Sequence, residues 1–368
     1  MSNMLQLLRN RTDAEVALVA QVSDLYDTGR LLWTREILRD IENQLDIHPE
    51  YLDVQPFNGG PRVRVPDPRT EEERRTAPRC TNPIVRFLGH RRLIDPMSTN
   101  KRLDPGQIYN TYTFRYMACA DVDLGRELNP HCAIRDFQHM RDQWQASLKC
   151  MELKCVFRNL PIPKGIDKIL CLGLGDIQKY DIPRDTICPV PVWNMEGLAE
   201  FSPAVQHAAA MTMRDVLAER FGTPDIQLLA QDPIYSQISQ TVLTHMGFQI
   251  VGRHGAGGFA EIDDNTLVFN YRDVVNNREI IAEIARPAVV ITEWDDQGPG
   301  STIDYDRDAI AGYTPDGQPI FRGLRWDYST PRTLLWQESY KQFAWPECYT
   351  TRDPSIRWRG MILVRVDS

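Results

Sequence analysis

Apolar residues repeat with helical spacing over the first 50 residues. Between 13 and 29 an apolar side chain recurs every three residues, and residues 30–45 carry a second stripe of leucine and isoleucine. This spacing places the apolar side chains on one face of a helix. The pattern predicts two amphipathic helices, and we assign residues 1–50 to a helical N-terminal extension.

The next segment, residues 51–107, interrupts this pattern. It contains several prolines and the charged run EEERR, a composition typical of loops and linkers. We therefore predict a basic, proline-rich linker here. Beyond it, the alternating residues 108–118 predict a half-buried strand. The apolar stripe over 136–157 predicts an amphipathic helix.

From residue 167 onward, short apolar runs alternate with amphipathic helices. We predict strands at 168–172, 226–230, 248–252, 266–270 and 288–294, and helices at 202–222, 236–246 and 278–286. Such alternation favours a mostly parallel sheet with helices on both faces. The sequence thus predicts an α/β domain over 108–350, with 351–368 as a C-terminal tail.

Composition narrows the class of protein. The 368 residues are 42% hydrophobic and 25% charged, as in an ordinary globular chain. No apolar run reaches the roughly 18 residues of a membrane span, so we expect no membrane partner. The eight cysteines form no CxxC pair and the N-terminus resembles no export signal. We therefore expect a cytoplasmic chain with reduced thiols, without a metal or a cofactor.

Polar residues follow the predicted strands. Asp176 ends the run LGLGD after the first strand, and Asp232 follows the second. In parallel sheets, ligands bind beyond the carboxyl ends of the strands. The glycines before Asp176 form either a tight turn or a close approach to a ligand. The dinucleotide fingerprint lacks its third glycine, which argues against a nucleotide-dependent enzyme.

Three further side chains near this edge can carry chemistry. His207 lies in the first turn of a helix and is either a general acid or base, an anion ligand or a scaffold histidine. Tyr235 and Ser236 supply hydroxyls beside Asp232. Asp232 either caps the next helix or holds a cationic group, and Ser236 is either a helix cap or a nucleophile.

A cluster of carboxylates follows the glycine-rich run GAGGFA. Glu261 and Asp263 stand there, directly before the strand TLVFN. They form either a solvated turn or an acidic wall suited to a guanidinium, an amine or a metal; no histidine or cysteine at ligand spacing supports a transition metal. We expect one cavity to collect Asp176, His207, Asp232, Tyr235, Glu261 and Asp263.

Positive charge is concentrated between residues 62 and 102. Eleven lysines and arginines stand there against five acidic residues, whereas the whole chain has a net charge of −8. Such a segment is either a solvated linker or a surface that binds phosphates. The candidate phosphate contacts are Arg74, Arg75, Arg91 and Arg92.

An ordered set of motifs resembles a known family. KILCLGLGD, QHAAAMTMRDVL, LLAQDPIYSQ, GGFAEIDDNTLVFN and IIAEIARPAVVI together resemble the "sensitivity to red light reduced"-like domain in its fungal form. The similarity covers about 165–295 and continues faintly through 330–347. The first 150 residues carry no comparable motif.

This resemblance implies a Rossmann-like, three-layer fold. The fungal branch is understood to include arginine-containing cyclodipeptide synthases, which use aminoacyl-tRNA, while other relatives are linked to signalling. The resemblance therefore suggests a tRNA-dependent cyclodipeptide synthase of secondary metabolism, with aminoacyl-tRNA and not DNA as partner. Ser236, Tyr235 and His207 would be its catalytic residues. A non-catalytic regulatory protein is the alternative.

Overall fold

The structure is a computed structural model of the whole chain. It describes residues 13–48, 50–76, 82–94, 109–117, 129–177, 202–270, 277–293, 310–313, 319–321, 330–346 and 360–366.

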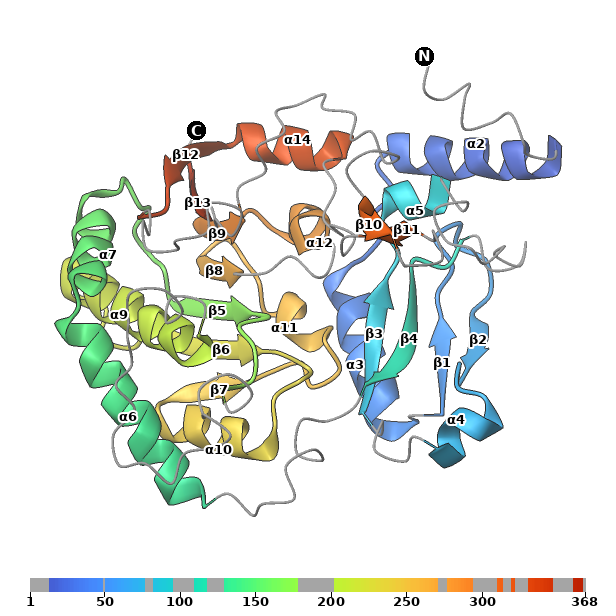
Figure 1. Cartoon of the computed structure of the whole chain (residues 1–368). Helices are drawn as coiled ribbons and strands as arrows, with labels where there is room; N and C mark the ends of the chain where they lie inside the picture. Colours follow the sequence, from blue (N-terminus) through green and yellow to red (C-terminus); the bar gives the residue numbers. More distant parts are fainter. Residues whose placement is uncertain are drawn as a thin grey trace.

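A seven-stranded sheet lies at the centre of the C-terminal part of the chain (Figure 1). Five of its strands run parallel, in the order β7-β6-β5-β8-β9. They are β5 (Lys168–Leu172), β6 (Gln227–Gln231), β7 (Phe248–Ile250), β8 (Thr266–Asn270) and β9 (Val289–Glu293). The five predicted strands and the mostly parallel sheet of an α/β fold are therefore confirmed.

Two antiparallel strands extend the sheet beyond β9. β13 (Gly360–Arg365) pairs with β9, and β12 (Tyr340–Ala344) pairs with β13. The prediction of a tail over 351–368 is wrong for these residues. The run GMILVR is buried over its first five residues, because it pairs with a strand almost 70 positions earlier, a partner that local pattern cannot reveal. A separate hairpin joins β10 (Ile310–Tyr313) and β11 (Pro319–Phe321).

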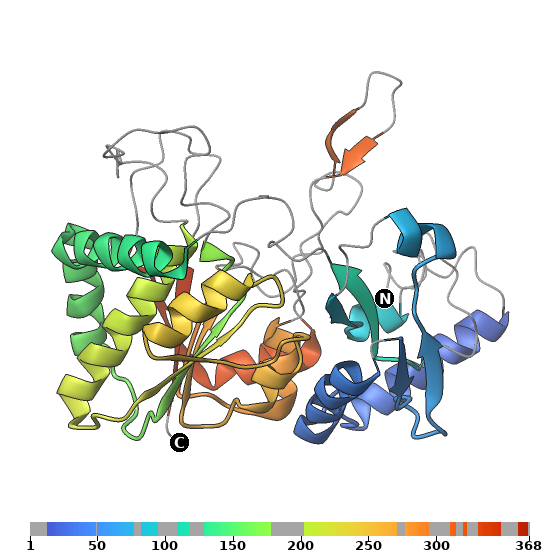
Figure 2. The ribbon, with the colours of Figure 1, turned by 90° about the horizontal axis from the view of Figure 1, so that it is seen from below.

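Helices cover both faces of the sheet (Figure 2). One face carries α6 (Pro130–Ala146), α7 (Leu148–Asn159), α9 (Pro203–Phe221) and α10 (Gln237–His245). The other face carries α3 (Arg35–Ile47), α11 (Gly257–Ala260), α12 (Asn277–Ile284) and α14 (Pro331–Glu338). Each face contributes one apolar cluster, because the side chains of a strand alternate between the two sides of a sheet.

The single helix predicted over 136–157 is two helices. Ser147 ends α6 in an extended conformation and caps α7, where its Oγ accepts a hydrogen bond from the backbone N–H of Cys150 at 3.2 Å. Serine is a strong N-cap because its hydroxyl satisfies an amide that has no partner within the helix. The apolar stripe continues across the break, so periodicity alone did not reveal it.

The described residues between 13 and 117 fold together into an N-terminal module. It contains α2 (Asp13–Asp27), α3, a hairpin of β1 (Tyr51–Val54) and β2 (Val63–Pro66), α4 (Glu71–Thr76), α5 (His90–Ile94), and a hairpin of β3 (Asn82–Phe87) and β4 (Tyr112–Met117). The linker predicted over 51–107 is thus wrong for its described residues, 51–76 and 82–94, and β4 belongs to this module instead of to the sheet domain. Several apolar residues of this range are buried, among them Leu52, Val54, Val85 and Phe87.

The N-terminal module packs directly on the sheet domain. The backbone N–H of Val85 donates to His254 O at 2.8 Å. The carboxylate of Glu42 on α3 accepts three backbone hydrogen bonds from the loop after β7, from the N–H groups of His254 (2.6 Å), Ala256 (3.0 Å) and Gly257 (2.8 Å). One apolar cluster includes side chains from both parts. None of the helices in the described ranges is long and apolar enough to cross a membrane.

Candidate functional site

The loops after β5 and β6 come together at the carboxyl edge of the sheet. β5 ends at Leu172 and leads through two glycines with positive φ to Asp176, while β6 ends at Gln231 and leads to Asp232. The two strands are adjacent and parallel, so both aspartates lie at the same edge. The two aspartates therefore lie beyond the carboxyl ends of the strands, where parallel sheets bind ligands.

Asp232 is held by the backbone of both loops. Its Oδ2 accepts a hydrogen bond from the N–H of Gly175 at 2.8 Å, and its Oδ1 accepts one from the N–H of Ile234 at 3.1 Å. Burial of the carboxyl raises the pKa of Asp232 to about 6, against the two backbone hydrogen bonds, which lower it; the charge of Asp176 raises it further. The residue as a whole keeps some exposure. A carboxylate with such a pKa can exchange a proton near neutral pH.

Asp176 lies fully buried behind this turn. Its Oδ2 accepts a hydrogen bond from the N–H of Ser236 at 2.5 Å. The Ser236 hydroxyl caps α10: it accepts from the N–H of Ser239 and donates to the Ser239 hydroxyl, both at 3.1 Å. The two loops therefore exchange carboxylate–amide bonds in both directions. The role of Ser236 as a nucleophile stays a prediction, and the observed contacts are those of a cap.

His207 and Tyr235 form a buried pair on the same edge. The Pro203 carbonyl lies 2.6 Å from His207 Nδ1, and the Tyr235 hydroxyl lies 2.8 Å from His207 Nε2. Because a carbonyl can only accept, Nδ1 carries the ring proton and the tyrosine O–H donates to Nε2. Burial lowers the pKa of His207 to about 4, and burial raises the pKa of Tyr235 well above its usual value. The histidine is therefore neutral near pH 7.

Glu261 and Asp263 do not join the other predicted site residues. Asp263 Oδ2 accepts a hydrogen bond from Lys168 Nζ at 2.6 Å, at the beginning of β5 and thus at the amino edge of the sheet. Glu261 is exposed in the turn after α11. The expectation of a single cavity is wrong for these two residues, because α11 and the turn after it return the chain to the amino edge before β8 begins.

The predicted phosphate contacts lie in the N-terminal module. Arg74 and Arg75 are exposed on α4, and Arg74 Nη1 lies 3.6 Å from Asp67 Oδ2. Arg91 and Arg92 fall on α5, but their side chains lie outside the described part of the structure. Asp67 also pairs with Arg69 at 2.8 Å. Part of the local positive charge is thus already paired within the module.

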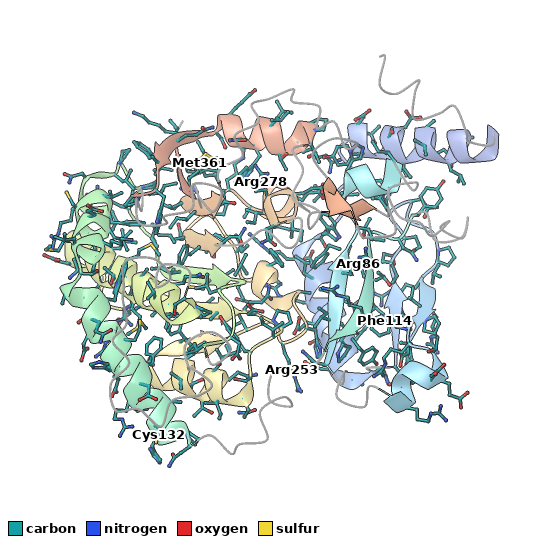
Figure 3. All side chains as sticks on the ribbon, viewed as in Figure 1. Arg86, Phe114, Cys132, Arg253, Arg278 and Met361 are labelled. Carbon is teal, nitrogen blue, oxygen red and sulfur yellow. The ribbon has the colours of Figure 1, made fainter. Side chains whose placement is uncertain are left out.

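Sequence reasoning missed side chains that come from outside the sheet edge. Asn82, at the start of β3, donates from Nδ2 to Pro233 O at 3.1 Å, next to Asp232. Figure 3 labels Arg86 on β3 and Arg253 on the loop after β7, the two segments that meet where the backbone N–H of Val85 donates to His254 O. No sequence signal links β3 to this edge, because the contact spans about 150 residues.

The described residues contain no group of three or more histidine, cysteine or acidic side chains that could hold a metal ion.

No curated protein and no solved structure gives a significant match to the chain. Residues 149–272, which are 124 of the 368, match the family model described as the SRR1 domain. The matched region runs from α7 to just beyond β8 and includes both aspartates of the carboxyl edge. This region of the chain is therefore similar to the SRR1 domain.

Proposed function

We propose that this chain is a tRNA-dependent cyclodipeptide synthase that takes arginine as one of its two amino acids. The observation that carries the proposal is Asp232: a partly buried carboxylate beyond the carboxyl end of β6, where parallel sheets bind ligands. Within the described part of the chain, its hydrogen bonds come from two backbone amides and from no cationic side chain. A cationic ligand would supply the missing positive charge.

Guanidinium suits this position better than other cations do. It is planar, carries five N–H donors and matches a carboxylate in a bidentate arrangement. Asp232 Oδ1 and Oδ2 each accept one backbone hydrogen bond, and a carboxylate has about four acceptor positions. Two positions remain for a guanidinium fork. Of the carboxylates that the sequence offered for a cationic group, Asp232 directly follows a strand end, whereas Glu261 is exposed in the turn after α11.

The topology supports a Rossmann-like domain as part of the proposal. Numbered along the chain, the five parallel strands follow the order 3-2-1-4-5, which is that of doubly wound nucleotide-binding sheets. In such sheets the ligand binds where the strand order reverses, here between β5 and β8. The loop that carries Asp176 leaves β5 at this point.

The reaction needs positioning more than activation, because an aminoacyl ester is already reactive. In the first step Ser236 Oγ attacks one ester carbonyl, and the 3′-terminal oxygen of that tRNA leaves with the serine proton. The first amide bond forms when the amine of this acyl group attacks the second ester, and the second tRNA oxygen leaves with the proton that the amine loses. The ring closes when the free amine attacks the Ser236 ester, and Ser236 Oγ leaves and regains its proton. Ser236 would carry the first acyl group only after its hydroxyl gives up the capping contacts with Ser239. Tyr235 and His207 would pass the proton. Arg74, Arg75, Arg91 and Arg92 would hold tRNA phosphates, in the cytoplasm.

Mass spectrometry of extracts from cells that express the chain tests this proposal. We expect new arginine-containing cyclic dipeptides, and we expect Asp232→Asn to abolish them while the protein stays folded. Glu261→Gln is the matched control: it neutralises an exposed carboxylate in the turn after α11 and should leave product formation unchanged. Purified wild-type protein that forms no cyclic dipeptide from arginyl-tRNA and a second aminoacyl-tRNA would overturn the proposal.

A regulatory protein without catalysis is the second candidate. The observation that favours it is that the three proposed catalytic side chains are buried and already hydrogen-bonded. Tyr235 is bonded to His207, and Ser236 is bonded to Ser239. In that case the substitution Ser236→Ala would change stability alone. Loss of product in Ser236→Ala, with its thermal stability kept, would rule this candidate out.

A further inference from the structure

Asn82 of the N-terminal module reaches the turn that holds Asp232. Its Nδ2 donates to Pro233 O at 3.1 Å, and Arg253 O lies 3.5 Å from the same atom. Two carbonyl acceptors fix the orientation of the amide, because only its nitrogen can donate. The amide oxygen of Asn82 must therefore face away from both carbonyls.

That oxygen has an unusual environment. Asn82 is only 7% exposed, and its Oδ1 has no hydrogen-bond partner in the part of the chain that the structure describes. A buried acceptor without a donor is costly, and such groups call for an explanation. A bound molecule could supply this donor. The Pro233 carbonyl that Asn82 contacts belongs to the residue directly after Asp232.

Packing holds the Asn82 amide next to the turn after β6, which carries Asp232. A Cβ at Gly255 would lie 3.1 Å from Pro233 Cγ and 3.6 Å from Val85 Cγ1. The turn after β6, the loop after β7 and the strand β3 are therefore in contact at one point. The N-terminal module forms part of the surroundings of Asp232, although the matched SRR1 region begins only at residue 149.

We propose that Asn82 Oδ1 accepts a hydrogen bond from an N–H of a cationic ligand held by Asp232, and that it selects guanidinium over ammonium. The inference rests on the proposed function, whose arginine specificity it explains. A guanidinium presents donors in several directions within one plane and can reach two acceptors, whereas a lysine ammonium is a compact point charge. The N-terminal module would thus determine which aminoacyl group the sheet domain accepts.

Calorimetric titration of the full chain with arginine amide and lysine amide tests the inference. We expect Asn82→Ala to weaken arginine amide binding about tenfold, equivalent to about 1.4 kcal/mol, and to change lysine amide binding less than about twofold. Asn110→Ala is the matched control. Asn110 lies in the same module, is 4% exposed and also has an unpartnered Oδ1. It should leave the preference unchanged.

A second measurement does not depend on the variant folding. In the wild-type chain, the side-chain amide NMR signal of Asn82 should shift on addition of arginine amide and not of lysine amide. An unchanged signal, an unchanged preference in Asn82→Ala, or an equal loss in both variants overturns the inference. So does a wild type that binds neither probe. If the Asn82-dependent preference is present but no cyclic dipeptide forms, the inference stands and the proposed enzyme activity fails.

Discussion

Asp232 should make the stability of the chain depend on pH, and Asp232→Asn should remove that dependence. The folded environment raises the pKa of this carboxyl from 3.8 to about 6, chiefly through burial. Between these two values the folded chain binds more protons at this group than the unfolded chain does. The free energy of unfolding therefore falls as the pH rises.

The size of the effect follows from the two pKa values. At 1.36 kcal/mol per pKa unit, the difference corresponds to about 3 kcal/mol. This penalty is negligible below about pH 3, grows through the interval and is complete above about pH 7. The asparagine variant carries no such penalty at any pH. Its stability relative to the wild type should therefore improve by about 3 kcal/mol from about pH 3 to about pH 7.5.

Urea unfolding of both proteins across this pH range measures the difference. Subtracting the two free energies of unfolding removes the titration of every other group that the two proteins share. Glu261→Gln serves as a control, because the Glu261 carboxylate is exposed. A difference that stays flat within about 0.5 kcal/mol, or one that changes in the opposite direction, would show that the carboxyl of Asp232 is solvated.

Three substitutions should reduce the free energy of unfolding. Gly252→Ala should cost about 2 kcal/mol or more, because the glycine has φ of 62° and its new Cβ would lie 2.6 Å from a backbone nitrogen and overlap Gln231 Oε1. Glu42→Ala should cost about 3 kcal/mol, since three backbone amides lose a charged acceptor. Arg332→Met on α14 should cost about 3–5 kcal/mol, because the buried carboxylate of Glu283, 2.5 Å from Arg332 Nη1 in the wild type, would lose its cation. Denaturant unfolding measures each.

Each of these substitutions has a control at a similar position. Gly222→Ala also places a Cβ at positive φ but meets nothing within 4 Å, so it should cost only about 1 kcal/mol. Asn43→Ala lies on the exposed side of α3 and should be nearly neutral, as should Arg135→Met, whose ion pair is exposed. A variant no less stable than its control would refute the contact assigned to it.

The parallel strands were predictable because their signal is local. β8 is buried at all five positions and β5 at four of five, as expected for strands covered on both faces, and their sequences are continuous apolar runs. The sequence also predicted that Asp176 and Asp232 lie at the same edge of the sheet, because each directly follows one of these strands. Strand order and the antiparallel strand β13 were not accessible, because both depend on pairing between distant segments.

The N-terminal module shows where local patterns mislead. Proline is typical of linkers, but Pro83 lies within β3. It is paired with Tyr116 of β4, the only strand that borders β3 in the described structure. A proline is tolerated in an edge strand, where its missing N–H breaks no ladder. Asn82 was therefore overlooked as part of a loop.

Local sequence also misled the prediction that Glu261 and Asp263 lie in one cavity with Asp232. Glu261 and Asp263 follow a glycine-rich run that continues from β7, so the sequence offered no sign that the chain had already crossed to the amino edge. The crossing begins with the four-residue helix α11. A single turn of GGFA carries no helical periodicity, and its glycines argue against a helix.

Proton release on ligand binding tests whether the carboxylate of Asp232 pairs with a guanidinium. Arginine amide should lower the pKa of Asp232 when the guanidinium pairs with it, so binding at about pH 6 should release about half a proton. Calorimetric titrations in two buffers of different ionisation enthalpy give this number. We expect this proton release in the wild type and none in Asp232→Asn. A wild type that does not bind arginine amide, or that binds it with the same proton release as the variant, would contradict the account.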